Sequence, residues 1–271
     1  MTTAPHPPQQ HYNSPIPVRR AHLGDALASE WTKIRSVRST MWTLGVMILL
    51  MVGVGVLSIV AINATDVDMG GESALPLGFN GVLLGTICVV TLGVLTIASE
   101  YGTGMIRTTL TACPSRSRVL AAKAIVFFLL TLVVTAITAA VVAALQTSMI
   151  EAGTATGEEW VRATVGAGLF TAVLGLLALG VGALVRHSAG AITIMIGVIL
   201  LPLVAAMFMS SLPKVQEFLF QYSVPSLLIA FYSDEGLTAG GPHGWTPLWI
   251  LSGLAAVVLA GAFLATEKRD V

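Results

Sequence analysis

The chain of 271 residues carries 14 acidic and 14 basic side chains, and only 10% of its residues are charged. Soluble domains contain about 25% charged residues, so this composition, with 55% hydrophobic residues, excludes an ordinary water-soluble domain. The zero net charge gives no reason to expect nucleic acid as a partner.

The first 18 residues are rich in Pro and Gln and contain no apolar run. Such a segment cannot bury enough apolar surface to fold, and it lacks the apolar region of a signal peptide. We therefore expect a disordered cytoplasmic tail over residues 1–20.

The next segment, residues 21–38, has apolar residues at helical spacing and basic residues off that stripe. The apolar positions are Leu23, Leu27, Trp31, Ile34 and, just beyond the segment, Met41, and the basic positions are Lys33, Arg35 and Arg38. This pattern predicts an amphipathic helix at the membrane interface, with Trp31 at headgroup depth and the basic face towards anionic lipids. The alternative is a merely basic segment beside the membrane.

Six stretches without Asp, Glu, Lys or Arg dominate the chain. They are residues 39–65, 73–99, 124–150, 163–185, 187–213 and 236–266. Each exceeds the roughly 20 apolar residues that cross about 30 Å of hydrocarbon, and each is too long and too uniformly apolar for a barrel strand. The sequence therefore predicts an all-α membrane bundle over 39–266, with six spans at about 41–62, 77–98, 122–146, 163–185, 189–209 and 247–265.

Small residues at helical spacing occur in two of these spans. Gly81 and Gly85 form a GxxxG motif, and Ala178 and Gly182 repeat the spacing. They predict close helix packing, either within one chain, which is the simpler interpretation, or across a dimer.

The loop at residues 99–123 has an organised layout. It contains Gly102 and Gly104, then Ile106, Leu110 and Cys113 on one helical face, and then Pro114. We expect a short helix that lies across the membrane surface and ends at Pro114. A partner protein could dock on this helix and transmit force through it to the spans. The alternative is a basic loop that only fixes the topology.

The connection between the fifth and sixth spans, residues 210–245, is too long for a hairpin turn. Within it, residues 215–233 are apolar but are interrupted by Pro225 and by several polar residues. This composition favours re-entrant or outer-leaflet helices, and a seventh span is the alternative.

The basic residues orient the bundle. With the N-terminus in the cytoplasm, twelve of the 14 Lys and Arg residues lie inside, and only Arg162 and Lys214 lie outside. Because positively charged loops stay cytoplasmic, we expect both termini inside, including a short C-terminal tail at 267–271. A seventh span would place Lys268 and Arg269 outside and weaken this bias.

At the loop after the second span the chain resembles the membrane (permease) subunit of an ATP-binding cassette (ABC) exporter of type 2. Members carry an acidic residue, a Gly-Thr pair, a short amphipathic helix, a Pro-x-x-Arg or Pro-Ser-Arg turn and a Lys that opens the third span. Those places are occupied by Glu100, Gly104, Pro114, Arg116 and Lys123, whereas Met105 stands where Thr is usual. The similarity extends to ASEWTKIRSVRSTMW at 28–42 and LVRHSAGAIT at 184–193.

The resemblance implies a site and partners. The implied ATPase-coupling loop consists of Glu100, Tyr101, Gly104, Arg107, Leu110, Pro114 and Arg116, and the implied interfacial helix presents Leu27, Trp31, Ile34 and Arg35. Two copies of an ABC ATP-binding subunit would dock there and bind ATP and Mg beneath a homodimer or heterodimer of permease subunits. The expected location is the bacterial cytoplasmic membrane.

No catalytic or metal-binding motif is present. The sequence contains no GxxxxGK[ST], HExxH, CxxC or GxSxG, and its five His residues lack partners at ligand spacing. We expect no enzyme activity, no catalytic or metal site and no cofactor in this chain. Its two cysteines, Cys88 and Cys113, are expected to be neither disulfide-bonded nor functional.

The energy source distinguishes two functions. A transporter driven by protons or sodium keeps ionisable residues inside its bundle, whereas those of this chain lie near span ends: Glu100, Lys123, Arg162, Arg186 and His187. We therefore expect an ATP-driven permease that exports a hydrophobic or amphipathic substrate, such as a drug, antibiotic, lipid or peptide. The alternative is a carrier, channel-like protein or assembly factor that works without an ATPase. The sequence assigns no residue to the substrate path.

Overall fold

The computed structural model describes residues 22–65, 69–113, 115–233 and 240–268. These residues form helices and no strand, apart from one isolated bridge between Ser73 and Gly153. The expected tail at 1–20, Pro114 and residues 269–271 lie outside the described residues.

Six helical segments are long and apolar enough to cross a membrane. They are α2 (Arg38–Thr65), η1 with α3 (Leu75–Gly78 and Phe79–Gly102), α5 (Arg116–Met149), α6 with η2 and α7 (Gly157–Val161, Arg162–Gly166 and Ala167–Val185), α8 (Ser188–Phe208) and α11 (Thr246–Lys268). The shorter helices are α1 (Leu23–Ser36), α4 (Met105–Ala112), α9 (Pro213–Gln221) and α10 (Val224–Ile229). The prediction of an all-helical chain with six helices suited to a multi-pass membrane protein is confirmed.

Two of the long segments begin about six residues earlier than the predicted spans. α5 begins at Arg116, and the segment that continues into α7 begins at Gly157. Charged residues limit the part of a helix that is stable in hydrocarbon, but they do not end the helix itself. At Gly157 the start is fixed by a capping box, because Thr156 Oγ1 accepts from the Glu159 amide while Glu159 accepts from the Thr156 amide.

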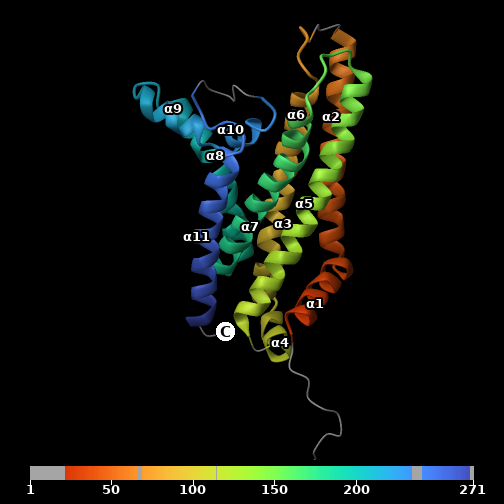
Figure 1. Ribbon diagram of the computed structural model, residues 1–271. Coiled ribbons are helices and arrows are strands. Elements are labelled where there is room, and N and C mark those ends of the chain that lie inside the picture. Colours follow the sequence, from red (N-terminus) through yellow and green to blue (C-terminus); the bar gives the residue numbers. More distant parts are fainter. Residues whose placement is uncertain (1–21, 66–68, 114, 234–239, 269–271) are drawn as a thin grey trace, which may run out of the picture.

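The long helices run side by side and place the short ones at two opposite ends (Figure 1). α1, α4 and the C-terminal end of α11 gather at one end, which we call the α1/α4 end. α6, α9 and α10 lie at the other end, where α9 extends sideways from the bundle.

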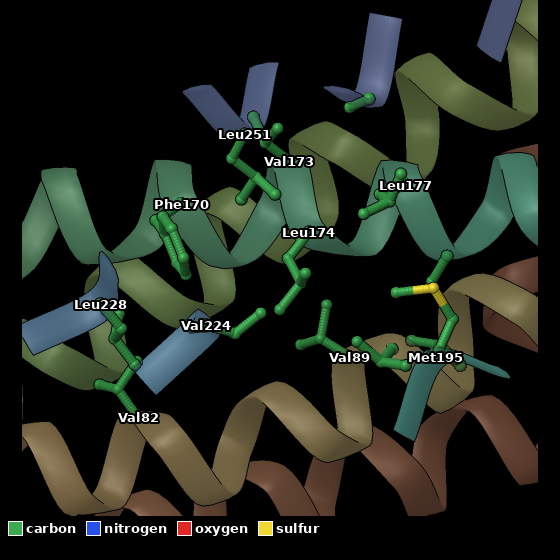
Figure 2. Packing of buried hydrophobic residues seen from close by; sticks show 14 of the residues in the cluster. Val82, Val89, Phe170, Val173, Leu174, Leu177, Met195, Val224, Leu228 and Leu251 are labelled. Carbon is green, nitrogen blue, oxygen red and sulfur yellow. The ribbon is translucent and has the colours of Figure 1, made fainter. Parts of the chain in front are cut away.

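The core is built around α3 and α7, the most buried of the six long segments. Figure 2 shows Val89 of α3 facing Leu174 of α7, with Leu228 of α10 also in this layer. The two central helices cross closely, since a Cβ added to Gly93 would lie 2.5 Å from the backbone oxygen of Gly175. In contrast, α2, α8 and α11 leave most of their apolar surface outside the core.

The small residues singled out in the sequence pack within the chain. A Cβ on Gly81 would lie 2.9 Å from the backbone oxygen of Met51 in α2, and one on Gly182 would lie 3.1 Å from that of Val94 in α3. These spacings therefore bring α2 against α3 and α3 against α7, as the simpler interpretation predicts.

The connection between α8 and α11 contains two short helices rather than a long one. α9 and α10 have nine and six residues, far fewer than the roughly 20 needed for a crossing, so the seventh span is not formed. The break occurs where Ser223 caps α10 by accepting from the Ser226 amide and Pro225 opens its first turn. α10 is buried in the bundle, whereas α9 has no buried residue.

Candidate functional site

Four charged side chains from three helices meet at the α1/α4 end. Lys123 Nζ of α5 lies 2.8 Å from Glu30 Oε2 of α1 and 2.6 Å from Glu100 Oε1 of α3. Lys33 Nζ of α1 lies 2.8 Å from Glu30 Oε1 and 2.9 Å from Glu100 Oε1. We call Glu30, Lys33, Glu100 and Lys123 the ion cluster, in which each lysine bridges both carboxylates.

Three members of the ion cluster are withdrawn from solvent. Lys123 is 1% exposed, Glu100 2% and Glu30 5%. A buried charge without a partner is strongly destabilising, and here the two positive and two negative charges compensate one another. The cluster therefore fixes three helices relative to one another only while all of its members remain charged and in contact.

Lys33 is the member nearest to solvent. Partial burial disfavours its charged form, but hydrogen bonds from its ammonium to Glu30 and Glu100 and attraction to both carboxylates outweigh burial and raise the pKa of Lys33. Lys33 Nζ also lies 3.4 Å from Thr109 Oγ1 of α4. The ammonium thus stays protonated at neutral pH and brings α4 into contact with the cluster.

Local sequence explains how these side chains come together. Lys33 and Ile34 follow Glu30 by three and four residues, so both lie beside it on the face of α1 that packs inward. Glu100 lies two residues before the end of α3, and Lys123 is the eighth residue of α5. α3 and α5 run in opposite directions and are joined through α4, which brings Glu100 and Lys123 to the same level.

Gly104 makes the turn from α3 into α4 possible. Its φ of +72° is in the left-handed region, which costs about 1–2 kcal/mol for a residue with a Cβ. We expect Gly104→Ala to lower the free energy of unfolding by about 1 kcal/mol, measured by denaturation in detergent. Gly102→Ala is the matched control, since this neighbouring glycine has no positive φ and open space around it. Equal losses in both variants would contradict a requirement for the left-handed turn.

A groove between α1 and α4 opens beside the ion cluster. It has a volume of about 350 Å³ and is lined by Asp25, Ser29, Glu30 and Lys33 of α1 and by Met105 and Thr108 of α4, among others. Glu30 and Lys33 belong to both the groove and the ion cluster. Whatever fills this α1/α4 groove would therefore contact the charges that hold α1, α3 and α5 together.

Two arginines outside the ion cluster contact other helices of the bundle. Arg116 Nη1, at the start of α5, donates to the backbone oxygen of Thr266 in α11 over 3.0 Å. The Arg186 guanidinium, between α7 and α8, lies over the Tyr101 ring of α3, 4.8 Å from its centroid. These contacts link α5 to α11 and α3 to the connection between α7 and α8, close to the ion cluster.

The structure brings most of the predicted coupling loop together. Glu100 lies in the ion cluster, Tyr101 and Arg116 make the contacts just described, and Gly104 precedes α4, whereas Pro114 lies outside the described residues. Of the three residues predicted to share an apolar face, Ile106 of α4 and Cys113, which follows α4, are buried, and Leu110 is half-buried. Arg107 lies on the exposed face.

The residues of the apolar stripe predicted for the N-terminal helix do not share one environment in the structure. Ile34 is buried and Leu27 half-buried, whereas Trp31 is 45% exposed and Arg35 is also exposed. Met41 belongs to the next helix, α2, because extended backbone at Val37 separates α2 from α1.

Sequence reasoning misplaced one residue of this site and missed another. The prediction that Lys33 belongs to a lipid-facing basic side is wrong, since two carboxylates draw its ammonium into the bundle. Glu30 was missed altogether, although its position three residues before Lys33 and four before Ile34 places it on their face. Glu100 and Lys123 do lie towards helix ends as expected, but the sequence did not indicate their burial.

The cluster does not have the composition of a metal centre. Among the residues that the structure describes, no three His, Cys, Asp or Glu side chains converge so as to hold a metal ion. The two lysines instead contact both oxygens of Glu30 and Oε1 of Glu100, while Glu100 Oε2 is buried without a hydrogen-bond partner among the described residues.

Comparison with known proteins yields one family. The family described as "Protein of unknown function (DUF2705)" matches residues 78–271. The match covers α3 and every later helix, with Glu100 and Lys123, but not α1, which contributes Glu30 and Lys33. No curated protein matches the chain.

Proposed function

We propose that this chain, which belongs to the DUF2705 family, is the membrane (permease) subunit of an ATP-driven ABC exporter of type 2. The observation that carries the proposal is that the α1/α4 groove shares Glu30 and Lys33 with the buried ion cluster. A soluble subunit docked in the groove would press on a site that connects three helices. ATP and Mg would be bound by that subunit, not by this chain.

The ion cluster offers a route for mechanical coupling. Separating one partner from a buried charge pair costs several kcal/mol, so α1, α3 and α5 resist moving apart at this level. When a docked ATP-binding subunit displaces α1 or α4, the least costly response is for α3 and α5 to move with them. Closure of two ATP-binding subunits would thereby tilt the long helices and open a path for the substrate.

The charge distribution supports a cytoplasmic location for the α1/α4 end. The helices of this end carry Arg35 in α1, Arg107 in α4 and Lys268 at the end of α11, and Arg186 contacts Tyr101 near the end of α3. The helices of the other end carry Glu158 and Glu159 in α6 and Glu217 in α9. Positively charged loops stay cytoplasmic, so α1 would lie at the inner interface of the bacterial cytoplasmic membrane. Exposed Trp31 and Trp42 are suited to headgroup depth there.

The opposite end would then face outwards. α9 is too short to cross a membrane and leaves apolar side chains such as Val215 and Phe218 exposed, which suits a helix in the outer leaflet. The exposed apolar faces of α2, α8 and α11 suit contact with lipid and with a second permease subunit, identical or not. The apolar spans favour a hydrophobic or amphipathic cargo.

An ATPase-independent carrier is the second candidate function. The observation that favours it is the pair of buried carboxylates, Glu30 and Glu100, since buried ionisable groups serve ion-driven transporters as coupling sites. The ion cluster differs from such a site in having each carboxylate already neutralised by lysines.

Co-expression with an ABC ATP-binding subunit from the same genome tests the proposal. We expect the two to co-purify in mild detergent and, after reconstitution, to export a hydrophobic substrate only when ATP is supplied. Transport that follows a proton or sodium gradient and ignores ATP depletion would favour the carrier. Recovery of the chain without any ATP-binding subunit, together with such transport, would overturn the permease proposal.

A substitution in the α1/α4 groove tests where the subunit docks. Thr108→Trp places a large ring in the groove, and we expect it to weaken co-purification and ATPase stimulation about tenfold, as for the loss of one important interface contact. Thr111→Trp on the same helix is the matched control. Both threonines are exposed and both hydroxyls donate to a backbone oxygen of α4, but Thr111 does not line the groove. Equal effects of both variants would contradict docking in the groove.

A further inference from the structure

A second group of buried polar atoms lies far from the ion cluster, towards the end of the bundle that holds α9 and α10. Gln146, in the last turn of α5, is 0% exposed, and neither its amide oxygen nor its amide nitrogen has a hydrogen-bond partner among the described residues. The hydroxyl of Tyr232, three residues after the end of α10, is also buried without such a partner. A membrane bundle offers no bulk water to satisfy these groups.

Both side chains line the same cavity, which has apolar walls formed by Met51, Leu75, Val82, Ala139 and other residues. They converge near Gly78, where a Cβ would lie 3.4 Å from Gln146 Oε1 and 3.6 Å from Tyr232 Cε1. The two side chains that carry the unpartnered polar atoms, one from α5 and one from the segment after α10, therefore line one small space.

The size of the cavity limits its occupant. It leaves about 10 Å³ for the centre of a water-sized molecule, and one water needs about 10–15 Å³ by this measure. No charged residue lines the cavity, so an ion would have no counter-charge. The space is also far too small for a drug or a lipid.

We propose that this cavity is a binding site for one water molecule held between Gln146 and Tyr232. The Gln146 amide supplies one donor and one acceptor, and the Tyr232 hydroxyl can donate or accept, so the water finds the roughly three hydrogen bonds that buried waters make. The water joins the end of α5 to the segment after α10. This inference does not depend on the proposed function.

The sign of a change in melting temperature tests the proposal. With water in the site, Tyr232→Phe and Gln146→Leu each remove one hydrogen bond and leave the other residue poorly satisfied, so each lowers the melting temperature. The double variant removes both polar groups, and its loss is smaller than the sum of the two single losses. In a dry cavity each single substitution removes an unsatisfied polar group, so the melting temperature would rise.

Tyr222→Phe is the control for loss of a tyrosine hydroxyl, because Tyr222 directly follows α9 and is exposed. We expect it to leave the melting temperature unchanged. A rise, or no change, in both Tyr232→Phe and Gln146→Leu would overturn the proposal.

A second measurement on the unmodified protein remains decisive if a variant fails to fold. X-ray radiolysis generates hydroxyl radicals from bound water, and mass spectrometry locates the side chains that they oxidise. Phe231, the neighbour of Tyr232, is 1% exposed and lies outside the cavity lining. Relative to the denatured protein, we expect oxidation of Tyr232 to exceed that of Phe231 several-fold. Equal protection of the two residues would overturn the proposal.

Discussion

Lys123→Met is expected to lower the free energy of unfolding by about 3–5 kcal/mol, because it removes one partner from a buried charge group. The substitution leaves the Glu30 and Glu100 carboxylates, both nearly inaccessible to solvent, with Lys33 as their one remaining lysine in the cluster. Denaturation of the purified protein in one detergent measures the loss.

Lys268→Met is the matched control. Lys268 ends α11 at the same end of the bundle, is exposed, and should cost little when replaced. Similar losses for Lys123→Met and Lys268→Met would show that the ion cluster contributes nothing specific to stability.

Combining substitutions in the ion cluster separates stability from coupling. Buried ion pairs replaced by uncharged residues often recover stability. Glu30→Gln, Glu100→Gln and Lys123→Met together leave only Lys33 charged, and its side chain is partly exposed, so this triple variant should be less damaging than Lys123→Met alone. If the cluster transmits motion, this triple variant still lacks ATP-dependent transport after reconstitution. Transport at the normal rate in the stable triple variant would assign the cluster a purely structural role.

Gly93→Ala is expected to have the second-largest effect, a loss of about 1–3 kcal/mol in the free energy of unfolding. The added Cβ would lie 2.5 Å from the backbone oxygen of Gly175, so two central helices must shift rather than one flexible side chain. The loss should appear as a lower melting temperature in detergent.

Gly253→Ala provides a control with the opposite expectation. Gly253 lies in α11 with nothing within 4 Å of its added Cβ, and alanine favours helices over glycine by up to about 1 kcal/mol. This variant should therefore be neutral or slightly stabilised. Destabilisation of Gly253→Ala to the same extent as Gly93→Ala would contradict the close crossing of α3 and α7.

The helices could be predicted from the sequence because hydrocarbon tolerates neither charges nor unpaired backbone groups over about 20 residues. The helix ends differ from the ends of the predicted spans, since a helix continues beyond the hydrocarbon wherever its residues allow. The start at Gly157 was predictable from the Thr156 and Glu159 capping pair, a local signal that was overlooked. No local pattern indicated the π-helix at Arg162–Gly166.

The candidate site could be predicted only in part. Glu100 and Lys123 were indicated by resemblance, but the partnership of Lys123 with Glu30 joins residues 93 positions apart. Such a contact depends on how α1 packs against α5, which neither periodicity nor charge bias encodes. For the same reason the sequence predicted the wrong environment for Lys33. It also gave no sign that Gln146, a single polar residue in an apolar span, would be buried.

α5 contributes to both polar sites described above. Lys123, in the ion cluster, lies near one end of the helix, and Gln146, in the small cavity, lies near the other. Its 34 residues include neither glycine nor proline, so at 1.5 Å per residue it is a stiff rod about 50 Å long, longer than the membrane is thick. Because α5 is stiff, a tilt imposed on it at one membrane surface also moves its end at the other membrane surface. Under the proposed ATP-driven function, paired spin labels at the two ends of α5, each measured against α7, would therefore record nucleotide binding as two simultaneous distance changes.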